Sequence, residues 1–152
     1  MTLRAVPLDA EYLSVGRHIA DFLALTKPRL VLMVLIATLA GYYLGSLGKF
    51  DWTRLLNTLI GTALAAGGTI ALNQYLERDL DAKMRRTRDR PLPDGRLQPD
   101  GALIFGLAIS VGGVLYLLFT VNAITSLSAA VTVSSYILLY TPLKRKSSFC
   151  TV

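Results

Sequence analysis

Residues 55–91 read LLNTLIGTALAAGGTIALNQYLERDLDAKMRRTRDRP, a long apolar run followed at once by acidic side chains and a burst of arginines. Three carboxylates, those of Glu77, Asp79 and Asp81, lie within five residues of one another at the end of that run. A carboxylate close to the core of a bilayer is costly unless it faces a cavity, a cation or a partner. The junction therefore predicts a membrane helix that carries a functional site at its end.

Hydrophobic residues make up 53% of the 152-residue chain, and they are gathered in blocks. A helix needs about 20 apolar residues to cross a hydrocarbon core of about 30 Å, and lipid offers no partner for backbone groups that lack one. Four blocks reach or approach that length, residues 30–47, 55–76, 103–121 and 124–140. We therefore expect an all-α, polytopic transmembrane bundle of about four helices.

The segment before the first block, residues 1–29, mixes basic and acidic side chains and lacks the apolar core of a cleavable signal peptide. We expect it to be a cytoplasmic N-terminal segment, followed by one membrane domain over residues 30–152. Cys150 is the only cysteine, which excludes an internal disulfide, and we assign it no role. His18 is the only histidine, and we expect it at the surface.

Basic residues are distributed unevenly between the two sides of such a bundle. Of the 16 Lys and Arg residues, 14 fall before the first block, between the second and third, or after the fourth, and only Lys49 and Arg54 fall on the other side. The positive-inside rule then places both termini and the acidic and basic connection in the cytoplasm of a bacterial inner membrane, or in the matrix if the membrane is mitochondrial. The net charge of +6 is explained by this topology and by anionic lipid, and no aromatic residues interleave with the arginines as in a nucleic-acid reader.

Three polar residues, Asn73, Glu77 and Asp81, are spaced four residues apart. Each four-residue step drifts by about 40° around a helix, so the three side chains span about 80° of one face. Two carboxylates and an amide oxygen suit a hard divalent cation, and Mg²⁺ in particular is often held by carboxylates together with substrate phosphates. The alternative on spacing alone is a set of helix-end residues paired with nearby arginines. Asp79 is expected to point away from this face and to pair with a basic neighbour such as Arg78.

The basic residues just downstream favour a phosphate ligand. Guanidinium groups bind phosphate oxygens through two parallel hydrogen bonds and keep their charge. The candidates in this stretch are Lys83, Arg86 and Arg90. No glycine-rich loop of the kind that cradles nucleotide phosphates is present. The region therefore predicts a metal-bridged diphosphate as its ligand.

Several sequence motifs, in the order in which they occur along the chain, resemble those of one family. The spacing Asn-x3-Glu-x3-Asp at residues 73–81, with KMRRT at 83–87 and RPL at 90–92, resembles the first acidic motif of the UbiA-type intramembrane prenyltransferases. Tyr140 and Lys144, spaced as Tyr-x3-Lys, match a second recurring element of that family. The resemblance runs from about residue 26 to the end, which makes it more specific than any single motif.

Within the family, the chain looks like the heme-farnesylating branch rather than the hydroxybenzoate branch. The phrases that carry this closer resemblance are TKPR at residues 26–29, DAKMRRT at 81–87 and YTPLKR at 140–145. The resemblance implies transfer of the farnesyl group of farnesyl diphosphate to a vinyl group of heme B, which gives heme O, in a lipid bilayer and with Mg²⁺ as cofactor. No nucleic acid takes part.

The resemblance also implies roles for individual residues. Asn73, Glu77 and Asp81 would act in catalysis as the metal ligands. Tyr140 would contact the diphosphate or shield an allylic cation, and it joins the catalytic set with Lys144. The residues expected to bind the diphosphate are Lys27, Lys83, Arg86, Arg90 and Lys144.

The chain departs from the family pattern in two ways. Glu77 stands where the family often has aspartate, and this longer carboxylate should still bind a metal. The family's second acidic motif belongs to a later helix pair, so we expect this chain to be roughly the N-terminal half of such an enzyme and to be inactive alone. Two alternatives stay open: a relative that uses another aromatic acceptor such as hydroxybenzoate, and a non-enzymatic four-helix membrane protein that serves binding or assembly.

Overall fold

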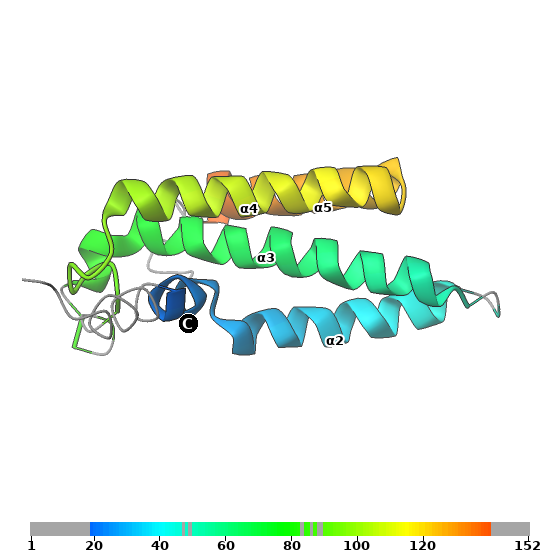
Figure 1. Cartoon of the computed structure of the whole chain (residues 1–152), viewed down its shortest axis with the longest axis horizontal. Coiled ribbons are helices and arrows are strands. Elements are labelled where there is room, and N and C mark those ends of the chain that lie inside the picture. Colours follow the sequence, from blue (N-terminus) through cyan, green and yellow to red (C-terminus); the bar gives the residue numbers. More distant parts are fainter. Residues whose placement is uncertain are drawn as a thin grey trace, which may run out of the picture.

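The computed structural model describes residues 19–46, 48, 50–82, 84, 85, 87 and 90–140, and this described part contains helices and turns but no strand. The helices are α2 (Pro28–Gly45), α3 (Trp52–Asp81), α4 (Pro99–Thr120) and α5 (Ala123–Ser135), and α5 continues into a π-helical turn, η1 (Tyr136–Tyr140). A shorter helical piece over residues 19–26 precedes α2. The helices lie nearly side by side and alternate in direction, with α3 between α2 and α4 (Figure 1). The predicted all-α bundle is confirmed.

Local sequence signals explain where these helices begin. Proline stands in the first turn of α2 and of α4, where its missing N–H group costs nothing. At the start of α3, the Asp51 carboxylate accepts a hydrogen bond from the Arg54 backbone N–H at 3.1 Å. At the start of α5, the Asn122 side-chain oxygen accepts one from the Thr125 N–H at 2.7 Å. Both side chains satisfy backbone donors that a helix start leaves without partners.

Within the described residues, three helices, α2, α3 and α4, are long and apolar enough to cross a membrane. The fourth predicted block forms a shorter apolar helix over Ala123–Leu138, which falls below that length. Three of the four expected spans are therefore confirmed at full length, and the chain is an integral membrane protein. The acidic residues belong to the membrane helix itself, because α3 ends at Asp81 rather than near residue 76 as the apolar block suggested.

Small residues bring α3 and α4 into close contact. A Cβ atom added at Gly68 would overlap the backbone of Ser110, and one added at Gly113 would overlap the backbone of Ala65. In lipid, where burial of apolar surface gives little drive for association, such close backbone approach is a main source of helix packing. The small residues of these two helices are thus in contact, and α3 lies between α2 and α4.

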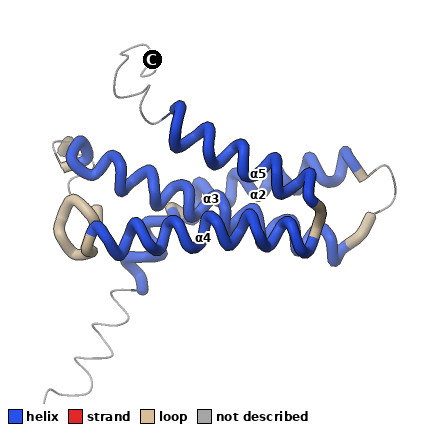
Figure 2. Tube along the Cα trace, turned by 90° about the horizontal axis from the view of Figure 1, so that it is seen from above, coloured by secondary structure: helices blue, strands red, loops and turns tan. Residues whose placement is uncertain are grey.

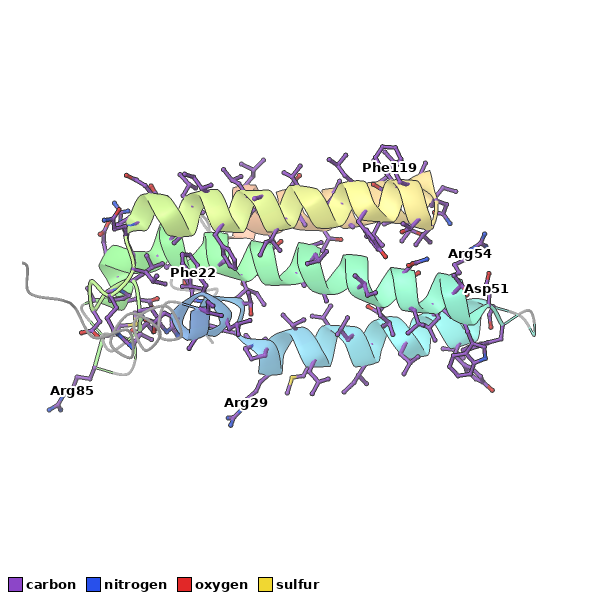
Figure 3. The ribbon with its side chains drawn as sticks, in the orientation of Figure 1. Phe22, Arg29, Asp51, Arg54, Arg85 and Phe119 are labelled. Carbon is purple, nitrogen blue, oxygen red and sulfur yellow. The ribbon has the colours of Figure 1, made fainter. Side chains whose placement is uncertain are left out.

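The two ends of the bundle differ. We call the end where α3 stops and α4 starts the acidic end, and the end with the connection between α2 and α3 and the turn between α4 and α5 the turn end. Figure 3 shows Arg85 at the acidic end and Asp51 and Phe119 at the turn end. The helical piece before α2 also lies at the acidic end, and α5 runs back toward it from the turn end (Figures 1 and 2). This arrangement agrees with the alternating topology that the basic residues predict.

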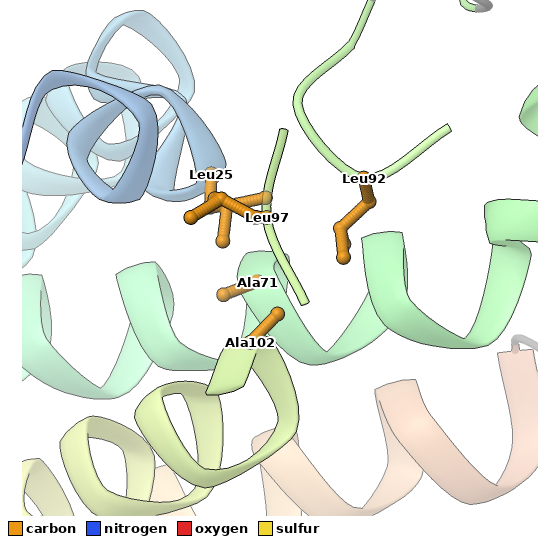
Figure 4. Packing of buried hydrophobic residues seen from close by; sticks show 5 residues of the cluster. All are labelled: Leu25, Ala71, Leu92, Leu97 and Ala102. Carbon is orange, nitrogen blue, oxygen red and sulfur yellow. The ribbon is translucent and has the colours of Figure 1, made fainter. Parts of the chain in front are cut away.

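At the acidic end, the connection between α3 and α4 folds back onto the helices. Its leucines, at positions 92 and 97, are buried against the helical piece before α2, against α3 and against α4 (Figure 4). The cluster consists of Leu25, Ala71, Leu92, Leu97 and Ala102, with Phe22, Tyr75 and Phe105 packed beside it. An ion pair between Arg96 and Asp21, with atoms 3.1 Å apart, adds a polar tie to the same contact. Residues 90–98 of this connection therefore lie in a defined place against α3 and α4.

Candidate functional site

The last turns of α3 hold the three residues predicted to bind a metal, and all three side chains are buried. The Asn73 side-chain nitrogen donates a hydrogen bond to a Glu77 carboxylate oxygen at 3.2 Å. Asp81 follows one turn later on the same buried side of α3. Asp79, in contrast, has a side chain that is 79% exposed and lies 3.6 Å from Arg78. The expected division between a buried acidic face and an outward Asp79 is confirmed.

Asp81 already has a cationic partner in this structure. An Arg90 guanidinium nitrogen donates to an Asp81 carboxylate oxygen at 2.5 Å. The buried Thr87 hydroxyl donates to the Asp81 backbone carbonyl at 2.8 Å, which satisfies a carbonyl that the helix end leaves open. The alternative of helix-end residues paired with arginines therefore holds at Asp81, whereas Asn73 and Glu77 contact each other.

The other predicted diphosphate ligands are only partly visible. Lys83, Arg86 and Lys144 lie outside the described residues, as does the side chain of Tyr140. His18 and Cys150 also lie outside the described part. Among the described basic residues, Arg85 is exposed and extends away from the bundle (Figure 3). Of the five predicted diphosphate ligands, the structure therefore places Arg90 beside Asp81 and Lys27 at the start of α2.

Lys27 occupies an unusual backbone position between the first helical piece and α2. Its φ of 46° and ψ of 70° are left-handed, a conformation that costs a residue with a side chain free energy. The neighbouring Thr26 packs near Gly67, since a Cβ added to that glycine would lie 3.4 Å from the Thr26 Cβ. The chain before α2 thus turns sharply against the middle of α3.

Gln74 is a residue that sequence reasoning missed. Its buried side-chain nitrogen donates a hydrogen bond to the Leu25 backbone carbonyl at 2.5 Å, which joins α3 to the end of the helical piece before Lys27. A signal was present, because an amide inside a membrane helix needs a partner and commonly finds it on a neighbouring segment. Gln74 holds the backbone that leads into Lys27.

An apolar cavity of about 630 Å³ lies between α2, α3 and α5. This volume falls within the roughly 300–1,000 Å³ that is usual for small-molecule sites. Several of the hydroxyl groups that line it donate within their own helices: those of Thr58, Thr69 and Thr132 each donate to the carbonyl four residues earlier, at 2.6–2.8 Å. These threonines therefore have their hydroxyl donors satisfied within the helix, and the cavity suits an apolar ligand.

The cavity and the acidic face follow one another along α3. Thr69 and Ile70 line the cavity, and Asn73 comes one helical turn after Thr69. An elongated molecule with an apolar tail in the cavity can therefore place a polar head group beside Asn73 and Glu77. A lipid-like chain with an anionic head has this shape and chemistry.

The donor set at the acidic face suits a divalent cation that is shared with a ligand. In the described part of the chain, no three His, Cys, Asp or Glu side chains are grouped closely enough to hold a metal by themselves. Asn73, Glu77 and Asp81 together offer one amide and two carboxylates. Mg²⁺ is commonly held by one or two carboxylates, with water and substrate phosphate oxygens completing its shell. The residues fit that mode, in which the anionic head of the ligand supplies further oxygens.

Comparison with known proteins agrees with this geometry. A family profile described as the UbiA prenyltransferase family matches residues 34–152. The chain is 45% identical over 140 residues to a protein named protoheme IX farnesyltransferase from Solibacter usitatus, an alignment that covers 86% of this chain and 48% of that protein. It is 42% identical over 144 residues to the protein of the same name from Aquifex aeolicus, covering 93% of this chain and 49% of that protein.

A third relative of that name, from Anaeromyxobacter dehalogenans, is 43% identical over 131 residues, which cover 86% of this chain and 44% of the relative. The chain thus spans about half the length of the curated relatives it matches. No solved structure matches it.

Proposed function

This chain belongs to the UbiA prenyltransferase family, and from that premise we propose that the whole protein transfers a farnesyl group from farnesyl diphosphate to heme B. The observation that carries the proposal is that an apolar cavity and a buried face of two carboxylates and an amide follow one another along α3. The names of its relatives support the choice of heme as the acceptor. A farnesyl chain would occupy the cavity, and its diphosphate would lie at the acidic end.

In the proposed reaction, the bond between C1 of the farnesyl group and the diphosphate oxygen breaks, and diphosphate leaves. C1 forms a new carbon–carbon bond to the terminal carbon of a heme vinyl group. Water adds its hydroxyl group to the other vinyl carbon and releases a proton, which gives the hydroxyethylfarnesyl side chain of heme O. The apolar cavity would keep water away from the allylic cation until the vinyl group is in place.

Asn73, Glu77 and Asp81 are the residues proposed to hold a divalent cation, for which we propose Mg²⁺. When bound, such a cation supplies electrostatic stabilisation of the departing diphosphate. The Asn73 side chain contacts Glu77 and orients its carboxylate. Asp81 and Arg90 lie together, so the guanidinium is positioned to donate to a diphosphate that binds beside Asp81.

The remaining basic residues are proposed to share the negative charge of the diphosphate. Lys27 is supported by its place before α2, where the hydrogen bond from Gln74 fixes the preceding backbone. Lys83, Arg86 and Lys144 are proposed from the family motifs alone, and so is the role of Tyr140 at the diphosphate or the allylic cation. Preorganised positive groups of this kind stabilise charge as it develops on a leaving group.

We propose that the acidic end faces the cytoplasm of a bacterial inner membrane, with residues 1–29 as a cytoplasmic segment ahead of the membrane domain. The uneven distribution of basic residues supports this orientation. With Cys150→Ser as the background, a cysteine at Lys49 should react with a membrane-impermeant reagent from outside. A cysteine at Asp94 should react only after the inner face is opened, and the reverse pattern would overturn the orientation.

The central test is an assay of the full-length protein in membranes with farnesyl diphosphate, Mg²⁺ and either heme B or hydroxybenzoate. We expect heme O from heme B, no prenylated product from hydroxybenzoate, and loss of turnover after chelation of divalent cations. If only hydroxybenzoate were prenylated, the protein would still be a prenyltransferase, but heme B would not be its acceptor. Absence of turnover with both acceptors, and of Mg²⁺-dependent binding of farnesyl diphosphate, would contradict the proposed function and favour a binding or assembly protein.

A further inference from the structure

Lys27, at the junction between the helical piece over residues 19–26 and α2, has a backbone conformation that is costly for a lysine. Among the described residues it is the only one other than glycine with a positive φ, at 46°. Pro28 follows it, and the residue before a proline is disfavoured in the ordinary helical region, so the helical piece ends here. Glycine or asparagine adopts the left-handed conformation at a lower cost. Such a conformation persists only where the surrounding structure holds it.

Two contacts with α3 hold this junction. The last carbonyls of a helix lack partners within the helix, and the buried Gln74 side chain supplies one to the Leu25 carbonyl by donating to it at 2.5 Å. One residue later, the Thr26 side chain packs at Gly67, where an added Cβ would lie 3.4 Å from the Thr26 Cβ. Gly67 and Gln74 are seven residues apart, almost two full turns, so both contacts lie on the same face of α3. The backbone that leads into Lys27 is thus fixed against that face.

Lys27 also lies toward the acidic end of the apolar cavity. Leu30 of α2 and Thr69 of α3 both line the cavity. The two helices run in opposite directions, so a step back along α2 and a step onward along α3 lead to the same end of the bundle (Figure 1). From these two lining residues, one helical turn in that direction reaches Lys27 on α2 and Asn73 on α3. A head group at this end of the cavity therefore has Lys27 on the α2 side and Asn73 on the α3 side.

We propose that Gln74 is a positioning residue for the diphosphate of the donor: by holding the Leu25 carbonyl, it places the Lys27 ammonium group where it binds that diphosphate. This inference rests on the proposed function, because it takes Lys27 as a ligand of the diphosphate. Gln74 does not touch the reacting atoms, and its effect passes through the backbone of residues 25–27. An amide that only joined two segments would affect stability, whereas a positioning residue affects diphosphate affinity by way of Lys27.

The test is a double-mutant cycle in the full-length protein, with Gln74→Met and Lys27→Met made singly and together. Methionine is unbranched and apolar, so it keeps most of either side chain and removes the donor or the charge. The dissociation constant of farnesyl diphosphate, in the presence of Mg²⁺, is measured by competition binding. We expect it to rise about tenfold in Lys27→Met and about three- to tenfold in Gln74→Met. The double variant should bind no more weakly than Lys27→Met alone, because the two residues act as one unit.

The matched control is Asn57→Leu. Asn57 is another amide of α3 that joins two segments, since its side-chain oxygen accepts a hydrogen bond from the Tyr116 hydroxyl of α4 at 2.8 Å, but it lies near the start of α3. Its loss should lower the thermal unfolding temperature and leave the affinity for farnesyl diphosphate unchanged. In Gln74→His, a ring N–H group replaces the amide donor, so part of the affinity should return. This variant, alone and with Lys27→Met, serves if Gln74→Met does not fold.

Two results would overturn the positioning role and leave the proposed function intact. One is an unchanged affinity for farnesyl diphosphate in Gln74→Met. The other is a further loss of affinity when Gln74→Met is added to Lys27→Met, because Gln74 would then act independently of the lysine. A wild-type protein that binds no farnesyl diphosphate in the presence of Mg²⁺ would overturn both the positioning role and the proposed function.

Discussion

The two parts of α3 make an instructive comparison. From Trp52 to Ile70 the helix lines an apolar cavity and contacts α4 through small residues, and the hydroxyls of Thr58 and Thr69 are satisfied inside their own helix. From Ala71 to Asp81 the same helix buries two amides and two carboxylates, which need partners from other side chains and from other segments. Packing of the first part depends on small side chains, whereas the second part is stable only if each buried polar or charged group has a partner. Substitutions should therefore affect assembly or ligand fit in the first part and chemistry in the second.

The largest effect is expected at the acidic part. Glu77→Gln or Asp81→Asn removes a negative charge and keeps the shape, so turnover by the full-length protein should fall by about 100-fold or more. The expression level and the thermal unfolding temperature of the purified variants should change little. Asp79→Asn is the matched control, because its exposed carboxylate lies off the acidic face, and it should keep most of the activity. Equal losses of turnover at all three positions would contradict the claim that only the two buried carboxylates take part in the reaction.

A smaller effect, on stability rather than chemistry, is expected where α3 meets α4. Gly68→Ala places a methyl group against the backbone of Ser110, which cannot move as a flexible side chain can, and overpacking of this kind costs about 1–3 kcal/mol. Thermal unfolding in detergent should show the loss. Gly112→Ala is the control on α4, because nothing lies within 4 Å of its added Cβ. Equal unfolding temperatures of the two variants would contradict the close backbone contact between α3 and α4.

The partner of Asp81 should show an intermediate role in substrate binding. Arg90→Gln removes a charged donor, and hydrogen bonds to charged groups contribute about 1.5–3 kcal/mol, so KM for farnesyl diphosphate should rise roughly tenfold. Arg90→Lys should recover only part of this loss, since lysine cannot form two parallel bonds with one phosphate. Arg85→Gln serves as the control, because Arg85 is exposed (Figure 3). A KM that is unchanged in Arg90→Gln would limit this arginine to stabilising the end of α3.

The smallest effect is expected for the hydroxyl groups of the cavity. Thr58→Val and Thr132→Val remove hydroxyls that donate to their own helices, so the tail of a prenyl diphosphate should meet nearly the same surface. The affinity for farnesyl diphosphate, measured by competition binding, should stay within about threefold, because the donors of these hydroxyls are already used within their own helices. A loss of affinity as large as that of Arg90→Gln would mean that these threonines contact a polar part of the ligand.

Much of the fold and part of the site could be predicted from the sequence. The apolar blocks predicted α2, α3 and α4 as membrane helices, and the four-residue spacing predicted that Asn73 and Glu77 share one face. The ends of the elements were less accurate, because hydropathy falls off gradually where a helix leaves the apolar layer. Thus α3 continues to Asp81, and the last apolar block forms a shorter helix that passes into a π-helical turn.

The helical type of the apolar blocks and the shared face of the acidic residues were determined by the sequence alone, because each follows from the length of an apolar block or from a spacing of four residues along one helix. Only the tertiary structure decided that Arg90 pairs with Asp81, that Gln74 donates to the Leu25 carbonyl and that Leu117 packs against Gly61. The partners in these contacts are separated by 9, 49 and 56 positions in the chain. Their meeting depends on the path of the connection between α3 and α4 and on how the helices dock, and neither is encoded in the periodicity of a single helix.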